Sequence, residues 1–314
     1  MTKEIKGANR GFLALILFYL LGSILISYLF DVASIDMPVW AQILLSQAMV
    51  FIPGVVYMLI AKKNPIEHCR YKKMGIINVL LTIAYTACCM PIVWFVNFVS
   101  MLFATNEIQE VSVSFTEYPF IVQLIFMACM PAFVEEFIFR GILYRNYRSG
   151  AGFGAAILSG ILFGMLHLNI NQFMYATVLG ILFAILVELT GSIFASSLAH
   201  FLVNGFSVTL TYVLSVVIDM MSGEIGMNFE EYMQKSQEMV AEPSTVVIQG
   251  VMFFGMAIAG AVGLFLCYLG FKKYNKKAED MKTYFKPEQK AKMITPSLVI
   301  AMLICVAYMI WAEI

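Results

Sequence analysis

Ionisable side chains stand inside segments of this chain that are otherwise apolar. The adjacent carboxylates Glu135 and Glu136, followed by Arg140, lie in the stretch PAFVEEFIFRG at Pro131–Gly141. Ionisable groups at membrane depth are costly and typically functional, so this stretch is the first candidate for a site. Two of the three histidines stand in similar surroundings. His167 ends the stretch FGMLH, and His200 begins HFLVN, which ends in Asn204.

Helical spacing predicts different roles for the two glutamates. Glu136 and Arg140 are four residues apart, which places them on one face of a helix in the favourable acid-before-base order. Glu135 is rotated by about 100° from Glu136 and needs a different partner. Pro131 frees a carbonyl and can kink the helix, which gives water or substrate a way in. A structural ion pair with a hydrogen-bonded second glutamate is the simpler alternative.

Depth along the helices brings the four candidate groups together. At a rise of about 1.5 Å per residue, Glu135 lies ~20 Å from Arg148, and His167 lies ~22 Å from Gly152. His200 and Asn204 lie ~14 and ~20 Å from Gly191. All four fall within one slab of the membrane. A histidine alone is more often a packing residue, but the convergence with Glu135 predicts an acid–base or metal site.

The residue types leave several chemistries open. Glu135, His167 and His200 could hold zinc through two nitrogens and one oxygen with an open position. The asparagine and the loose ligand spacing fit an oxyanion site better, so we expect catalysis without a cofactor and keep zinc as the alternative. Ser196 and Ser197 precede His200 by about one turn, but neither an HExxH nor a GxSxG motif is present.

Composition indicates what must position these groups. The 314 residues are 61% hydrophobic and only 13% charged, with a mean hydropathy of +0.84. Soluble domains are about 45–50% apolar, so we predict an all-α polytopic membrane bundle of about eight or nine spans, forming a single membrane domain over residues 1–314. The candidate spans are Gly11–Phe30, Pro38–Ile60, Ile77–Ala104, Tyr118–Tyr144, Phe153–Leu168, Gln172–Leu189, Ser192–Ile218, Val247–Phe271 and Pro296–Ala312.

Basic residues predict the orientation of the bundle. All but one of the 20 lysines and arginines lie in, or border, the N-terminus and the even-numbered loops, and Lys235 is the exception. The positive-inside rule then places the N-terminus in the cytoplasm and the C-terminus outside. The acidic loop Asp219–Val246 is expected outside, with a short helix that begins at a capping box of Asn228 and Glu231. The lysine-rich segment after Phe271 is interpreted as an ordinary cytoplasmic loop.

The motifs, taken in order, resemble a known family. EEFIFR fits EExxxR, FGMLH fits FxxxH and HFLVN fits HxxxN, each inside a predicted span. This arrangement is similar to the CPBP family of CAAX proteases and bacteriocin-processing enzymes, also called Abi, which includes the type II CAAX prenyl endopeptidase. The likeness covers roughly Tyr118–Ser207, which we take as the catalytic core.

The resemblance implies an intramembrane endopeptidase of the glutamate type. On that pattern Glu135 activates water with help from His167, while His200 and Asn204 hold the oxyanion, and Glu136 and Arg140 support the site. Its partners would be the lipid bilayer and a peptide or protein substrate in or at the cell membrane, with no nucleic acid. Two alternatives stay open: a proton-coupled transporter that uses the buried carboxylates as a relay, and a non-catalytic immunity or scaffolding protein.

Overall fold

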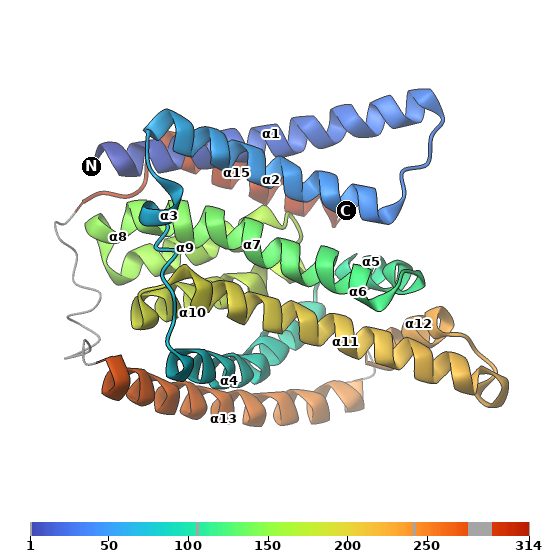
Figure 1. Cartoon of the computed structure of the whole chain (residues 1–314). Helices are drawn as coiled ribbons and strands as arrows, with labels where there is room; N and C mark the ends of the chain where they lie inside the picture. Colours follow the sequence, from blue (N-terminus) through green and yellow to red (C-terminus); the bar gives the residue numbers. More distant parts are fainter. Residues whose placement is uncertain (1, 105–106, 241–242, 276–290, 314) are drawn as a thin grey trace.

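The computed structural model describes residues 2–104, 107–240, 243–275 and 291–313, and over these residues the regular elements are all helical. The long helices run side by side along one direction, as Figure 1 shows. This is the all-α polytopic bundle that composition predicts.

Among the described residues, seven helices are long and apolar enough to cross a membrane. One of them, Phe120–Ala151, changes its winding along its length. It consists of α6 (Phe120–Leu124), π-helical turns at Ile125–Cys129, α7 (Met130–Glu136), π-helical turns at Phe137–Tyr144, and α8 (Arg145–Ala151). The other six are α1 (Lys3–Ala33), α2 (Val39–Ala61), α4 (Ile76–Met101), α10 (Ile170–Thr190), α11 (Ile193–Ile225) and α13 (Pro243–Asn275).

Every predicted span corresponds to a helix, but two of them are shorter than a full crossing needs. These are α9 (Phe153–Leu166), with 14 residues, and α15 (Pro296–Ala312), with 17. Helix α9 ends early because Leu168 has a left-handed backbone with φ of 54°. Asn169 then caps α10, since its side-chain oxygen accepts from the backbone N–H of Gln172 at 2.9 Å. The expected eight or nine spans are therefore seven long helices with two shorter apolar ones.

The acidic loop is shorter than the sequence predicts, because α11 continues past Ile218 to Ile225. The predicted helix in this loop is confirmed as α12 (Phe229–Val240). Its capping box is also confirmed. The backbone N–H of Asn228 donates to the Glu231 carboxylate at 3.0 Å, and the backbone N–H of Glu231 donates to the Asn228 side-chain oxygen at 2.9 Å. Two further short helices are α3 (Pro65–His68) and α5 (Glu107–Ser114), the latter followed by a 3₁₀ turn at Phe115–Glu117.

Contacts between distant segments place the basic loops at one end of the bundle. Lys63 donates to the Asn146 side chain at 3.0 Å, and the Ser192 hydroxyl donates to the backbone carbonyl of Lys72. At the same end Asn9 donates to the Met293 carbonyl at 2.7 Å. Helix α12 lies at the other end (Figure 1). Most of the lysine-rich segment, residues 276–290, is outside the described residues.

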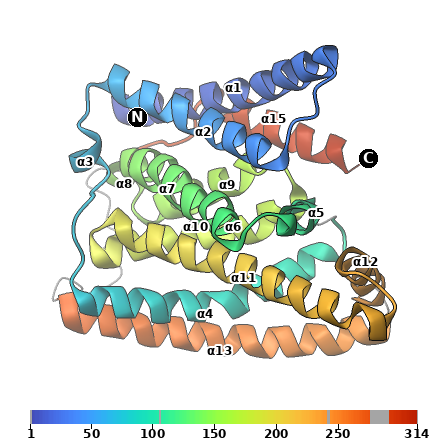
Figure 2. The ribbon, with the colours of Figure 1, turned by 45° about the vertical axis from the view of Figure 1, so that its right-hand side comes forward.

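Small residues bring the helices into close contact. An added Cβ on Gly180 of α10 would lie 2.6 Å from the Cα of Gly160 in α9, so these two helices touch through their backbones. Gly160 and Gly164 form the small-xxx-small spacing that is common where membrane helices pack closely. Helices α4 and α13 also lie side by side in both views (Figures 1 and 2), and a Cβ on Gly260 would lie 2.6 Å from the Cys88 carbonyl.

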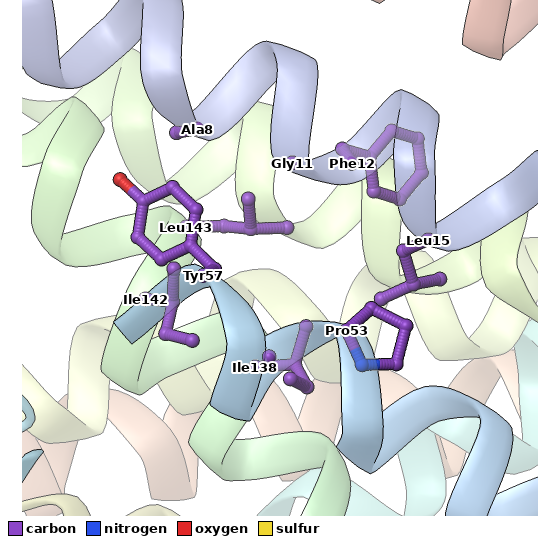
Figure 3. Close-up of a pocket in the computed structure, with 10 residues that line it drawn as sticks. Ala8, Gly11, Phe12, Leu15, Pro53, Tyr57, Ile138, Ile142 and Leu143 are labelled. Atoms are coloured by element: carbon purple, nitrogen blue, oxygen red, sulfur yellow. The ribbon is translucent and has the colours of Figure 1, made fainter. Parts of the chain in front are cut away.

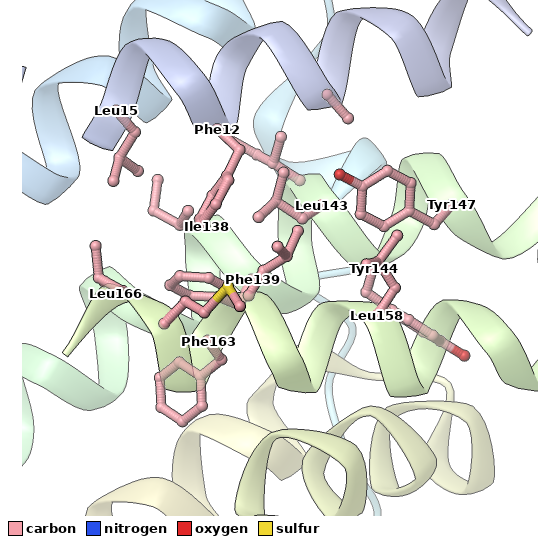
Figure 4. Packing of buried hydrophobic residues seen from close by; sticks show 14 of the residues in the cluster. Phe12, Leu15, Ile138, Phe139, Leu143, Tyr144, Tyr147, Leu158, Phe163 and Leu166 are labelled. Atoms are coloured by element: carbon pink, nitrogen blue, oxygen red, sulfur yellow. The ribbon is translucent and has the colours of Figure 1, made fainter. Parts of the chain in front are cut away.

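The largest apolar core surrounds the C-terminal half of the Phe120–Ala151 helix. Figure 4 shows Phe12 and Leu15 of α1 packed toward Ile138 and Leu143, with Phe163 of α9 beneath them. Figure 3 shows a cavity of about 20 Å³ between α1, α2 and this helix. Its lining is apolar and includes none of the predicted site residues, so we interpret it as a packing defect.

Candidate active site

The helix that carries the two glutamates is irregular on both sides of them. The π-helical turns Ile125–Cys129 precede Pro131, and those of Phe137–Tyr144 follow Glu136. Turns of this kind are frequent at functional sites, and they accommodate a proline whose missing N–H interrupts regular bonding. Asn204 of α11 donates to the Met127 carbonyl at 3.2 Å, so the asparagine is tied to the first of these turns.

Glu136 and Arg140 form the ion pair that their spacing predicts. The Arg140 Nη1 lies 2.8 Å from Glu136 Oε1, and both side chains are completely buried. The guanidinium carbon also lies 4.4 Å from the ring centre of Phe163 and 5.2 Å from that of Phe183. Aromatic faces attract a cation electrostatically, so the arginine is held by one carboxylate and two rings.

His200 lies between the two glutamates. Its Nδ1 is 3.0 Å from Glu136 Oε1, and its Nε2 is 3.9 Å from Glu135 Oε2. Because an ionised carboxylate only accepts, we assign a hydrogen to Nδ1, which leaves Nε2 facing Glu135. Glu136 therefore contacts both Arg140 and His200, where the sequence predicted only the arginine.

Glu135 differs from its neighbour in exposure and in partners. Its relative exposure is 7%, whereas Glu136 is fully buried. Its Oε1 accepts a hydrogen bond from Gln47 Nε2 of α2 at 3.1 Å. Gln47 was not among the residues predicted from the sequence, although an amide in the apolar run Pro38–Ile60 was a visible signal.

His167 and Asn204 are placed around this cluster without joining it directly. His167 lies at the end of α9, with Nδ1 at 2.9 Å from the Phe163 carbonyl. The Phe163 ring stands edge-on to both histidines, with centroids 5.1 Å from His167 and 5.8 Å from His200. No hydrogen bond or ion pair within the described residues joins His167 to either glutamate.

A zinc ion needs three or four donor side chains gathered around one point. Within residues 2–104, 107–240, 243–275 and 291–313, no three His, Cys, Asp or Glu side chains are gathered so as to hold one. Glu135, His167 and His200 are therefore not gathered around one point as they are placed here.

Two other predicted or unassigned groups have clear partners. Glu188 had no role in the sequence analysis, and its carboxylate lies 3.2 Å from Arg148 Nε and 3.6 Å from Arg70 Nη1. This partly buried cluster joins α10 to α8 and to the loop before α4. The Ser196 hydroxyl donates to the Ile193 carbonyl at 3.0 Å, so it is engaged by its own helix.

Comparison with known proteins bears on the segment that holds this cluster. Residues 117–206 match the family model described as "Type II CAAX prenyl endopeptidase Rce1-like". Over this segment the chain is similar to the Rce1-like family. The match agrees closely with the stretch Tyr118–Ser207 on which the motifs resemble the CPBP family, and it includes every candidate residue except Gln47.

A curated relative is similar to the chain over a segment of comparable length. The chain is 32% identical over 78 residues to "Putative membrane peptidase YdiL" of Bacillus subtilis (strain 168). The aligned region is 24% of this chain and 32% of the relative, so it spans about a third of that protein's length. No solved structure matches the chain.

Proposed function

We propose that the protein is an intramembrane endopeptidase that hydrolyses a peptide bond of a membrane-associated peptide or protein. The observation that supports this most is the buried chain of contacts from Arg140 through Glu136 and His200 toward Glu135. Charged groups are costly at membrane depth, and here they meet in the Rce1-like segment.

In this proposal Glu135 is the general base. It is the more exposed of the two glutamates, and only one of its oxygens is bonded to Gln47. The second oxygen faces the imidazole, so a water between Glu135 Oε2 and His200 Nε2 would have a proton acceptor beside it. A carboxylate within reach of the nucleophilic water is the geometry that base catalysis requires.

His200 stabilises the negative charge that develops on the carbonyl oxygen of the substrate. With His200 protonated, the four groups Glu135, Glu136, Arg140 and His200 carry no net charge, which suits a buried site. Glu136 keeps the Nδ1 hydrogen, so the hydrogen on Nε2 is free to be donated to an oxyanion. His167 and Asn204 complete the site as the family pattern implies, His167 beside the water and Asn204 as a second donor.

The substrate and the orientation belong to the same proposal. Because the family description names prenyl endopeptidases, the first substrates to try end in a prenylated cysteine followed by three residues. We place the N-terminus in the cytoplasm of a cell membrane and the C-terminus outside, since the basic loops lie together at one end.

The decisive experiment compares wild-type protein with Glu135→Gln in lipid nanodiscs. The probes are internally quenched peptides that end in Cys-Val-Ile-Met, with and without a farnesyl group on the cysteine. Wild type should cleave at least one of them, and Glu135→Gln should reduce turnover by about 10³-fold or more while its melting temperature stays unchanged. Equal cleavage by both proteins, or none by the wild type, would contradict the proposal.

A further inference from the structure

Gln47 is a polar group at the candidate site that comes from outside the Rce1-like segment. It lies in α2, about 70 residues before that segment begins. We propose that Gln47 is a positioning residue for Glu135: its amide nitrogen holds Oε1, and this directs Oε2 toward His200. The inference rests on the proposed function for its catalytic meaning, but the contact itself can be tested separately.

The chemistry of the pair fixes which end of the amide faces the carboxylate. An ionised carboxylate has no hydrogen to donate, so only the Gln47 nitrogen can bond to it. The distance of 3.1 Å lies within the normal range of such bonds. The Gln47 oxygen is buried and has no hydrogen-bond partner in the described part of the chain. The hydrogen bond to Glu135 therefore fixes the Gln47 side chain at its nitrogen end.

The packing of α2 explains why Gln47 reaches Glu135. Phe51, one turn later, lies against Phe133 and Phe137 with ring centroids 6.2 and 5.6 Å apart. Gly54, a further turn along, lets Ile138 approach closely. Gln47, Phe51 and Gly54 are spaced by four and three residues, so they share one face of α2.

A contact near the other end of α2 fixes the same register. Trp40 packs edge-on against Phe126, with ring centroids 6.4 Å apart, seven residues before Gln47. One face of α2 is thus fitted along the helix Phe120–Ala151 on both sides of the amide. The position of Gln47 follows from this fit and needs no contact of its own to define it.

The geometry gives Gln47 a specific task. A carboxylate can rotate about its terminal bond, and with one oxygen held the other has a defined direction. Glu135 Oε1 accepts from Gln47 Nε2, and Glu135 Oε2 lies 3.9 Å from His200 Nε2. Removing the amide should leave Glu135 in the site but allow its carboxylate to rotate.

The experiment uses Gln47→Met, which keeps the length of the side chain and removes the donor. Infrared difference spectra are recorded between Gln47→Met and Gln47→Met/Glu135→Gln, and between wild type and Glu135→Gln, so that each pair isolates the Glu135 carboxylate stretch. We expect the band to move in the Gln47→Met background. The matched control is Gln42→Met on the same helix, whose amide donates to the Met37 carbonyl at 2.8 Å and should leave the band unchanged.

Kinetics with the quenched peptides give the second measurement. Gln47→Met and Gln47→Glu should lower kcat about tenfold or more and leave KM within about twofold, because a misdirected base slows chemistry without weakening binding. An unmoved band, an unchanged kcat, or an effect confined to KM would overturn the assignment. Cleavage that survives in Glu135→Gln would instead contradict the proposed function, and the infrared comparison would still decide whether Gln47 holds Glu135.

Discussion

Adjacent glutamates with the same chemistry occupy different environments in this protein. Glu136 is fully buried and bonded to both Arg140 and His200, whereas Glu135 is slightly exposed and has a single amide donor. A difference of one position on the helix separates a fully buried, ion-paired carboxylate from one that is slightly exposed. At the scale of single residues, the two should therefore respond differently to the same substitution.

Glu136→Gln should destabilise the protein as well as impair it. The change strands the Arg140 charge in an apolar interior and weakens the bond to His200, and breaking a buried pair costs about 3–5 kcal/mol. Lower yield and a lower melting temperature than those of Glu135→Gln are the expected results, measured by thermal unfolding monitored by tryptophan fluorescence in detergent.

The double variant Glu136→Leu/Arg140→Met provides the control for this interpretation. It removes both charges together, so no group is left uncompensated, and it should be more stable than Arg140→Met alone. A double variant as unstable as the worse single variant would show that the loss is one of packing and not of charge. It should not cleave peptides in either case, because His200 loses its partner.

Sequence reasoning reached those parts of the site that depend on spacing along one helix. It predicted the Glu136–Arg140 pair. The common depth of Glu135 and the histidines stays a prediction. It did not predict that His200 bonds to Glu136, since the angle between α11 and the Phe120–Ala151 helix is set by packing. Gln47 was missed for the same reason, because the sequence of α2 does not indicate which neighbouring helix the Gln47 side chain contacts.

At the scale of elements, the contact between α9 and α10 depends on glycines. A Cβ at Gly160 would lie 2.8 Å from the Thr177 carbonyl, a backbone atom that cannot rotate away. Gly160→Ala should therefore destabilise the protein by about 1–3 kcal/mol, because the two helices must separate. Thermal unfolding would measure this, with Gly255→Ala of α13 as the control, where nothing lies within 4 Å of the added methyl and no loss is expected.

The loop between α2 and α4 should make stability depend on pH. Burial, together with the nearby charges of Lys63 and Arg145, lowers the pKa of His68 from 6.5 to about 4. The unfolded chain then binds the proton more readily, so this contribution is complete above about pH 6.5 and is lost as the pH falls toward 4. Because His68 is only half-buried, the loss should stay near 1 kcal/mol after solvent screening.

Melting temperatures of wild type and His68→Gln at pH 7.5 and 4.5 would measure this contribution. Other groups also titrate in this range, so the quantity of interest is the difference between the two proteins. Wild type should lose more stability on acidification than His68→Gln. Equal losses would show that His68 is free to be protonated in the folded protein.

For the whole molecule, the separation of charge between the two ends predicts its topology. Single cysteines at Lys73 and Lys235 should react with a membrane-impermeant maleimide from opposite sides, Lys235→Cys in intact cells and Lys73→Cys only after permeabilisation. Both positions are exposed. The native Cys69 gives little background, since burial raises the pKa of its thiol to about 12. Labelling of both sites from the same side would contradict the proposed topology.

The short helix α9 bears on how the chain enters the bilayer during synthesis. Its 14 residues extend only about 21 Å, and a span ordinarily needs about 20 residues, so this segment is a poor insertion signal by itself. Helix α10 follows after a three-residue turn and touches α9 through Gly160 and Gly180. The two helices should therefore be released from the translocon as a hairpin, and the turn that carries His167 would reach its depth only when α10 has been made.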